Sequence, residues 1–134
     1  MKTQNVLIVI VLMAASGVLT ANTVLEERLS TYAKNSGSSF SSQQGKDLWF
    51  KEFHDAETGK QRSCTSCHTK DATRGGKHAK TGKAIDPLAP SVNHERFTDA
   101  KKIEKWFKRN CKWVMGRECS DQEKGNFLSY LRSL

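Results

Sequence analysis

The stretch Ser63-Cys64-Thr65-Ser66-Cys67-His68 decides the fold of this chain. It contains Cys-x-x-Cys-His, a spacing in which two thiols can bond to the two vinyl groups of one porphyrin and the next imidazole can bind its iron. The pattern predicts one covalently attached haem c, held by Cys64 and Cys67, with His68 as the proximal axial ligand. A dithiol redox pair and half of a zinc site are the alternatives. The sequence offers neither a second Cys-x-x-Cys nor a His-x-x-x-His for them.

Two further cysteines, Cys111 and Cys119, lie eight positions apart, and no histidine follows Cys119. They therefore cannot form a second attachment motif, and we expect a single haem. In an oxidising compartment, two cysteines so placed are expected to form a disulfide. Two free thiols are the alternative.

The first 21 residues have the layout of a secretory signal. Lys2 precedes an apolar run from Val6 to Ala15, and small residues lead to a predicted cleavage site after Ala21, with cleavage after Gly17 as an alternative. A retained anchor is disfavoured because the run is about half of the ~20 apolar residues that a spanning helix needs. We expect a signal peptide over residues 1–21, one domain over residues 22–134, and a periplasmic protein.

Composition limits how this domain can be stabilised. The chain of 134 residues is 37% hydrophobic, and the leader takes a good share of that. About a hundred residues remain, near the lower limit for a self-sufficient core, so a covalent cofactor and a disulfide are expected to help. The net charge of +8 suggests an anionic partner. Base-reading and RNA-binding signatures are lacking, so nucleic acid is not expected.

Hydrophobic periodicity predicts four helices. The first covers residues 23–34, and the second runs from a Ser41–Gln44 capping box through Phe53. The third begins near Thr98 and Asp99, with Thr98 as its cap. The last begins at a Ser120–Glu123 capping box. The segment between His68 and the third helix shows neither helical nor strand period. The pattern indicates an all-α, class I-like cytochrome c domain. Gly45 and Gly125 would let the second and last helices cross closely, unless both are simply surface positions.

Several residues are candidates for the distal side of the iron. In the third helix, Ile103, Trp106, Phe107 and Asn110 fall on one stripe. We expect Trp106 and Phe107 to form haem-pocket walls, whereas periodicity alone favours Asn110 as a helix C-cap. The distal candidates are, besides Asn110, Met115 and three histidines: His54, His78 and His94. A methionine or histidine would make a closed electron carrier.

Four stretches resemble the SHP family, the sphaeroides haem proteins, which are oxygen-binding monohaem cytochromes c. They are SCTSCHTKDATRGGK (63–77), TGKAIDPLAPS (81–91), ERFTDAKKIEKWFKRNC (95–111) and GREC (116–119). The most specific feature is Arg-Asn-Cys followed eight residues later by a second cysteine.

The resemblance implies roles for residues that periodicity leaves open. It makes Asn110 the distal axial ligand and pairs Cys111 with Cys119. In the family, the asparagine leaves the iron on reduction, which lets oxygen, nitric oxide and similar ligands bind. The resemblance also implies a dihaem cytochrome c as electron donor. Met115 is the residue that fits this picture least, because a thioether in the same loop would compete for reduced iron.

Basic residues gather on the predicted third helix. A solvated face explains some of them, and a docking surface for an acidic redox protein explains a cluster near the haem. No distal acid–base pair is recognisable, so enzymatic reduction of oxygen, nitric oxide or peroxide stays an open question. The cluster comprises Lys101, Lys102, Lys105, Lys108, Arg109 and Lys112.

Overall fold

The computed structural model describes residues 19–134, with side chains from Thr23 onward. Residues 1–18, which hold most of the expected leader Met1–Ala21, lie outside this range. The helices are α1 (Leu19–Ser36), α2 (Ser42–Phe50), α3 (Thr65–His68), α4 (Ala100–Met115) and α5 (Asp121–Arg132). Two small hairpins join them, made of β1 (Phe53–His54) with β2 (Gln61–Arg62) and of β3 (Gly76–Lys77) with β4 (Ala84–Ile85). No described helix is long and apolar enough to cross a membrane.

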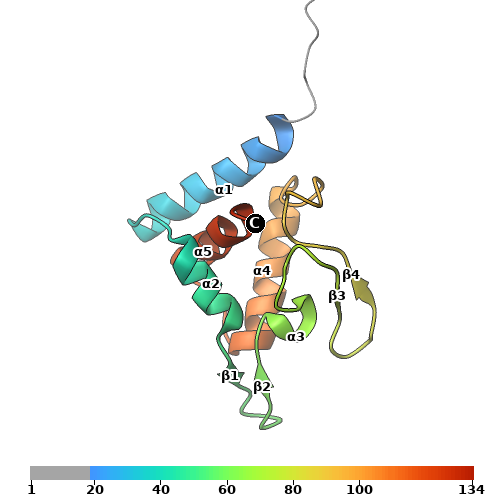
Figure 1. Ribbon diagram of the computed structural model, residues 1–134. Helices are drawn as coiled ribbons and strands as arrows, with labels where there is room; N and C mark the ends of the chain where they lie inside the picture. The colour runs from blue at the N-terminus through green and yellow to red at the C-terminus, as the bar shows by residue number, and fades with distance from the viewer. Residues whose placement is uncertain (1–18) are drawn as a thin grey trace, which may run out of the picture.

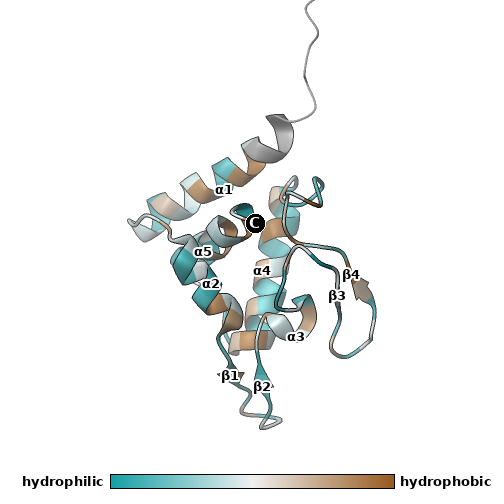
Figure 2. Ribbon diagram, in the orientation of Figure 1, coloured by the Kyte–Doolittle hydropathy of each residue, from teal (hydrophilic) through white to brown (hydrophobic). Residues whose placement is uncertain are grey.

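Helix α5 lies at the centre of the fold, packed against α1 and α2 (Figure 1). Two groups of buried side chains surround it. One includes Trp49, the Cys111–Cys119 pair and Phe127, and the other forms around Leu25, Leu29, Tyr32, Ile103 and Leu128. Apolar and polar residues alternate along α1, α2 and α4 (Figure 2), as expected for helices that bury one side. The prediction of an all-α fold is confirmed, with two short hairpins as its only strands in the described residues.

Three helix starts were expected from capping residues, and the structure refines them. Ser41 caps α2, since its hydroxyl accepts from the backbone amide of Gln44, but its own backbone amide donates to Asn126, so the expected capping box is only half formed. Ser120 and Glu123 make the full capping box of α5, as predicted. At α4 the cap is Asp99, whose carboxylate accepts from the backbone amides of Lys101 and Lys102, and the prediction of Thr98 is wrong. A carboxylate at this position also favours the positive end of the helix dipole. Thr98 instead donates to the carbonyl of Glu95.

Several segment boundaries differ from the sequence prediction. Helix α2 ends at Phe50, three residues before the expected Phe53, because the chain turns there into the β1–β2 hairpin. The segment after His68, which shows no period, contains the β3–β4 hairpin. These strands have two residues each, too few for an alternating pattern to be seen in a sequence.

Gly45 and Gly125 are both buried, but they make room for different neighbours. A Cβ on Gly45 would lie 2.0 Å from the carbonyl oxygen of Asn126, so α2 and α5 cross there at a distance that only glycine permits. A Cβ on Gly125 would lie 2.2 Å from the Phe40 ring. The expected close crossing is confirmed at Gly45, whereas Gly125 accommodates a ring rather than α2.

Gly45→Ala is expected to destabilise the holoprotein strongly, by about 3 kcal/mol or more, because backbone at a helix crossing cannot move aside as a side chain can. Thermal unfolding followed by circular dichroism measures the loss. Lys46→Ala, at the next and exposed position of α2, is the matched control and should change stability little. Equal stability of the Gly45→Ala protein would contradict the close crossing.

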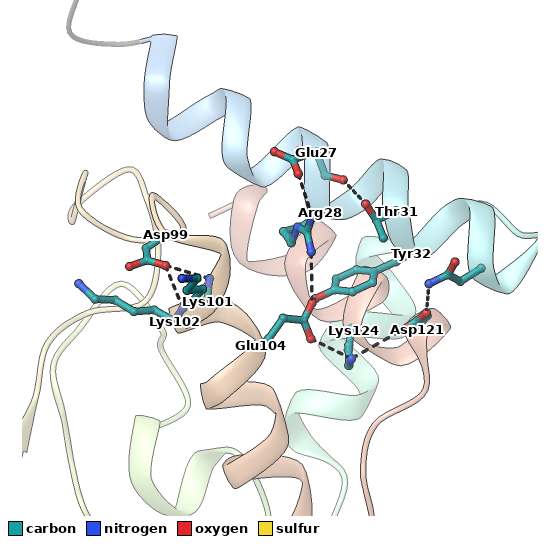
Figure 3. A network of polar contacts seen from close by, with 11 residues as sticks. Glu27, Arg28, Thr31, Tyr32, Asp99, Lys101, Lys102, Glu104, Asp121 and Lys124 are labelled. Atoms are coloured by element: carbon teal, nitrogen blue, oxygen red, sulfur yellow. Dashed lines mark hydrogen bonds and ion pairs between the residues drawn. The ribbon is translucent and has the colours of Figure 1, made fainter.

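A polar network ties α1, α4 and α5 together above the core (Figure 3). Tyr32 donates a short hydrogen bond to Glu104, and Lys124 lies 3.1 Å from the same carboxylate. Burial raises the pKa of Tyr32, and the hydrogen bond to Glu104 raises it further, so its hydroxyl stays protonated. Lys124 also lies 3.5 Å from Asp121. The network fixes the N-terminal half of α4 against the first and last helices.

Candidate haem site

The attachment motif forms the short helix α3, which places His68 at its end. Burial lowers the pKa of His68 to about 4, with a smaller contribution from the charge of Arg96. The imidazole is therefore neutral at neutral pH, which is the form that binds iron. Burial likewise raises the pKa of the Cys64 thiol.

Trp49 supports the imidazole from the core. Its ring centroid lies 5.7 Å from that of His68, with the planes tilted by 40°. The indole nitrogen donates a 3.2 Å hydrogen bond to the carbonyl of Thr69, the residue that follows the motif. Because Trp49 is only 2% exposed and also packs on Tyr130, it fixes the orientation of the His68 ring.

The β3–β4 hairpin packs against the backbone of the motif. A Cβ on Gly76 would lie 2.1 Å from the carbonyl oxygen of Cys67 and 2.9 Å from the Cα of His68. Glycine is therefore required for this contact. The backbone amide of Ala79 donates to the Cys67 sulfur at 3.4 Å, which holds that sulfur in place.

A second wall of the site comes from Arg96 and the loop before it. Its guanidinium donates to the backbone carbonyls of Pro87 at 2.7 Å and Asp86 at 2.8 Å. Asn93 donates to the same Pro87 carbonyl at 3.0 Å. These bonds order the segment that follows β4, close enough to His68 for the Arg96 charge to act on it.

Asn110 lies inside α4 and does not cap it. The helix continues to Met115, and Gly116 closes it with a left-handed backbone, φ 72°. The interpretation of Asn110 as a C-cap is therefore wrong. The buried residues of α4 are Ile103, Cys111 and Val114. Each residue of an α-helix is rotated by about 100° around the helix axis from the one before it. Asn110 therefore lies about 40° around the axis from Val114, on one flank of this buried stripe.

The two expected pocket residues have different surroundings. Trp106 is 47% exposed, and the guanidinium of Arg109 lies 5.2 Å from its ring centroid. It occupies the same flank of α4 as Asn110, four residues earlier. Phe107 is partly buried and packs between Tyr32 and Phe127, with centroid distances of 6.4 and 6.3 Å. Phe107 thus belongs to the core, and Trp106 is the aromatic residue beside Asn110.

The cysteines of the later segment form a disulfide, Cys111–Cys119, with an S–S distance of 1.98 Å. Both are buried. The Met115 sulfur lies 3.7 Å from the Cys119 sulfur, and its side chain packs against the core cluster. In this arrangement Met115 fills space behind the disulfide.

The three remaining histidines are all exposed. His54 lies in β1. The Nδ1 of His78 accepts from the backbone amides of Lys80 and Thr81, so this imidazole orders the β3–β4 turn. His94 lies in the turn before α4. None of the three lies in α3 or α4, the helices that carry His68 and Asn110.

Sequence comparison finds related cytochromes. The chain is 44% identical over 84 residues to cytochrome c'' of Methylophilus methylotrophus, covering 63% of this chain and 58% of that protein. It is 52% identical over 69 residues to the cytochrome c-type protein SHP of Cereibacter sphaeroides, covering 52% of this chain and 53% of that protein. The matches thus span somewhat more than half the length of these relatives.

Solved structures extend the likeness to nearly the whole fold. Oxidized SHP, described as an oxygen binding cytochrome c, superposes with a TM-score of 0.74 at 37% identity, over 82% of this chain and 96% of that one. The crystal structure of oxidized cytochrome c'' from Methylophilus methylotrophus gives 0.73 at 36% identity, over 87% and 95% of the two chains.

The fold and the donor set define the class of protein. Two thiols and a neutral, partly buried imidazole beside them fit one covalent haem, and the hairpin packed on the motif backbone holds them in place. The chain is a monohaem c-type cytochrome whose cofactor is haem c. It belongs to the SHP family of cytochromes and matches, over residues 35–131, the family model described as a domain of unknown function, DUF1924.

Sequence reasoning did not identify Trp49, Arg62 or Arg96 as residues that support the site. Trp49 could have been suspected, because its position four residues after Gly45 puts it on the same face of α2, towards the core. Arg62 lies in a two-residue strand and Arg96 in a turn, and neither segment is long enough for periodicity to show which side chains pack inward.

Proposed function

We propose that this chain is an exported, periplasmic cytochrome that accepts electrons from a partner cytochrome and binds diatomic ligands such as oxygen or nitric oxide. Cys64 and Cys67 hold the haem, His68 binds the iron on the proximal side, and Asn110 binds it on the distal side. When bound, the haem supplies a one-electron iron centre with a position for a small ligand. Asn110 would hold the ferric centre through its amide oxygen and would leave the ferrous one.

The observation that carries this proposal is the position of Asn110. Its side chain is exposed, and it lies on the flank of the buried stripe of α4, directly before the Cys111–Cys119 bridge, in a chain related to an oxygen binding cytochrome c. The amide oxygen is a hard, neutral donor, which suits ferric iron better than ferrous iron. A weak ligand on a rigid helix can leave without unfolding its surroundings. A related cytochrome c'' structure is itself described in terms of haem-ligand detachment.

A closed electron carrier is the second candidate, with Met115 or a histidine as distal ligand. The packing of Met115 behind the disulfide argues against the methionine, because its sulfur would have to leave the core cluster. His78 would give up the two amide contacts of its turn if its ring were to reorient.

The electron donor that we propose is a dihaem cytochrome c or another acidic redox protein. Helix α4 presents four lysines on the side opposite its buried stripe: Lys101, Lys105, Lys108 and Lys112. All four are exposed, and only Lys108 and Lys112 have an acidic neighbour, Glu118, at 4.0 and 3.9 Å. Such a face attracts acidic partners over long range and keeps the complex weak and salt-sensitive.

Absorption spectra of the purified holoprotein test the ligand-binding proposal. The expected ferric spectrum has no methionine–iron charge-transfer band, and the ferrous spectrum is high-spin and changes at once on addition of carbon monoxide. A low-spin ferrous spectrum that carbon monoxide leaves unchanged would refute the opening site and favour the closed carrier.

A further inference from the structure

A partly buried arginine joins the haem-attachment segment to the part of α4 that carries Asn110. Arg62 lies in β2, two residues before Cys64, and only 18% of its side chain is exposed. Its Nη1 donates a 3.0 Å hydrogen bond to the carbonyl of Trp113. The guanidinium also lies 4.7 Å from the centroid of the Trp113 ring. One side chain therefore makes a polar and a stacking contact with the same residue.

Trp113 links the contact with Arg62 to the turn of α4 that carries Asn110. It follows Asn110 by three residues, about one helical turn, so the two lie on the same flank of α4. Its carbonyl belongs to the last turn of the helix, where carbonyls lack partners within the helix. A cation at this negative end of the helix dipole is favourable. Arg62 thus satisfies the helix end and fixes its position relative to β2.

Asp55 holds the arginine in this position. Its carboxylate forms an ion pair with Arg62 and is only 10% exposed. A hydrogen bond from the Thr58 hydroxyl, followed by weaker contributions that include Arg62, lowers the pKa of Asp55, so the pair is ionised at neutral pH. The β1–β2 hairpin pairs Phe53 with Arg62, and its β1 strand contacts α4. Figure 1 shows the hairpin beside the end of α4.

We propose that Arg62 is a positioning residue that sets how strongly Asn110 binds the ferric iron. With Asp55 it forms a clamp, Asp55–Arg62–Trp113, that fixes the Asn110 turn of α4 relative to the segment leading into the attachment motif. The clamp acts through Asn110 and touches neither the iron nor an incoming ligand. This inference rests on the proposed function, because it requires Asn110 to be the labile ligand.

The sign of the change in reduction potential distinguishes a positioning role of Arg62 from a purely electrostatic effect of its charge. If the clamp holds Asn110 on ferric iron, its loss weakens the ligand that favours the ferric state, and the reduction potential rises. If Arg62 acts only as a nearby positive charge, its removal favours the ferric state and the potential falls. The two explanations therefore predict opposite shifts.

The experiment compares the holoprotein with Arg62→Met, which keeps the length of the side chain but removes its charge and donors. Loss of a charged hydrogen bond is expected to weaken Asn110 ligation about tenfold. For a one-electron couple, this corresponds to a rise in potential of about 59 mV. The ferric spectrum should gain high-spin character in parallel. In an Asn110→Ala background, the same substitution should give no rise.

Further variants keep the test decisive. Lys60→Met removes the same charge from an exposed position of the hairpin and should give no rise. If Arg62→Met does not retain haem, Asp55→Asn replaces it and should raise the wild-type potential more than that of Asn110→Ala, because the loss of the negative charge acts in both backgrounds and the clamp only in the first. A fall in potential, no change, or an equal shift in both backgrounds would overturn the clamp. If Asn110→Ala itself leaves the ferric spectrum unchanged, the proposed function fails first, and the two failures are distinguished.

Discussion

Replacing Asn110 by alanine is expected to give a ferric holoprotein without its distal amide and with a higher reduction potential. The reason is that a hard oxygen ligand stabilises ferric over ferrous iron, so its removal destabilises the oxidised state. Each tenfold loss of that preference raises the potential by about 59 mV for a one-electron couple. Potentiometric titration followed by absorption measures the shift. The ferric variant should also bind exogenous ligands such as cyanide faster than the wild-type protein.

Met115→Leu is the matched control for this experiment. Leucine has a similar volume, and a swap of this kind in a core costs less than about 1.5 kcal/mol. Because Met115 packs behind the disulfide, its substitution should leave the ferric and ferrous spectra unchanged. If Met115→Leu changes the spectra and Asn110→Ala does not, the distal ligand has been assigned to the wrong residue.

The fold could be predicted from the sequence where helices have caps and a long period. The capping box of Ser120 and Glu123 at the start of α5 is an example. The short hairpins could not be predicted, because two-residue strands carry no period. Their presence depends on tertiary contacts, such as the Gly76 backbone against Cys67. The start of α4 was misplaced by one residue because Thr98 and Asp99 are both good caps.

The candidate site was predictable as far as its covalent chemistry. A five-residue motif names both thiols and the imidazole, since attachment to one porphyrin fixes their spacing. The distal residue was open, because helix periodicity does not tell a ligand from a cap. The structure removes the cap interpretation by extending α4 beyond Asn110 to Met115. Supporting residues such as Trp49 and Arg62 depend on contacts between segments distant in sequence, which the sequence alone does not reveal.

Removing the disulfide with the double substitution Cys111→Ala and Cys119→Ala is expected to lower stability markedly. Closing a loop of this length lowers the conformational entropy of the unfolded chain, which stabilises the folded state by about 2–3 kcal/mol. Both sulfurs are also buried, at 5% and 7% exposure, in the cluster that contains Trp49 and Phe127. For a domain of about a hundred residues, the loss should lower the Tm by roughly 10–20 °C. Thermal unfolding of the holoprotein, followed by circular dichroism, measures it.

The spin state of the ferric iron gives a second, independent measurement on the same double variant. Cys111 directly follows Asn110, so the bridge limits how far this turn of α4 can move. Without it, the ferric protein should gain high-spin character even at temperatures where it is fully folded. Met115→Leu again serves as control, because it alters the same cluster and keeps the bridge. A Tm within a few degrees of wild type would mean that the Gly116 turn and the α5 capping box order this loop by themselves. A lower Tm with an unchanged ferric spectrum would mean that Arg62 and helix packing hold Asn110 without help from the disulfide.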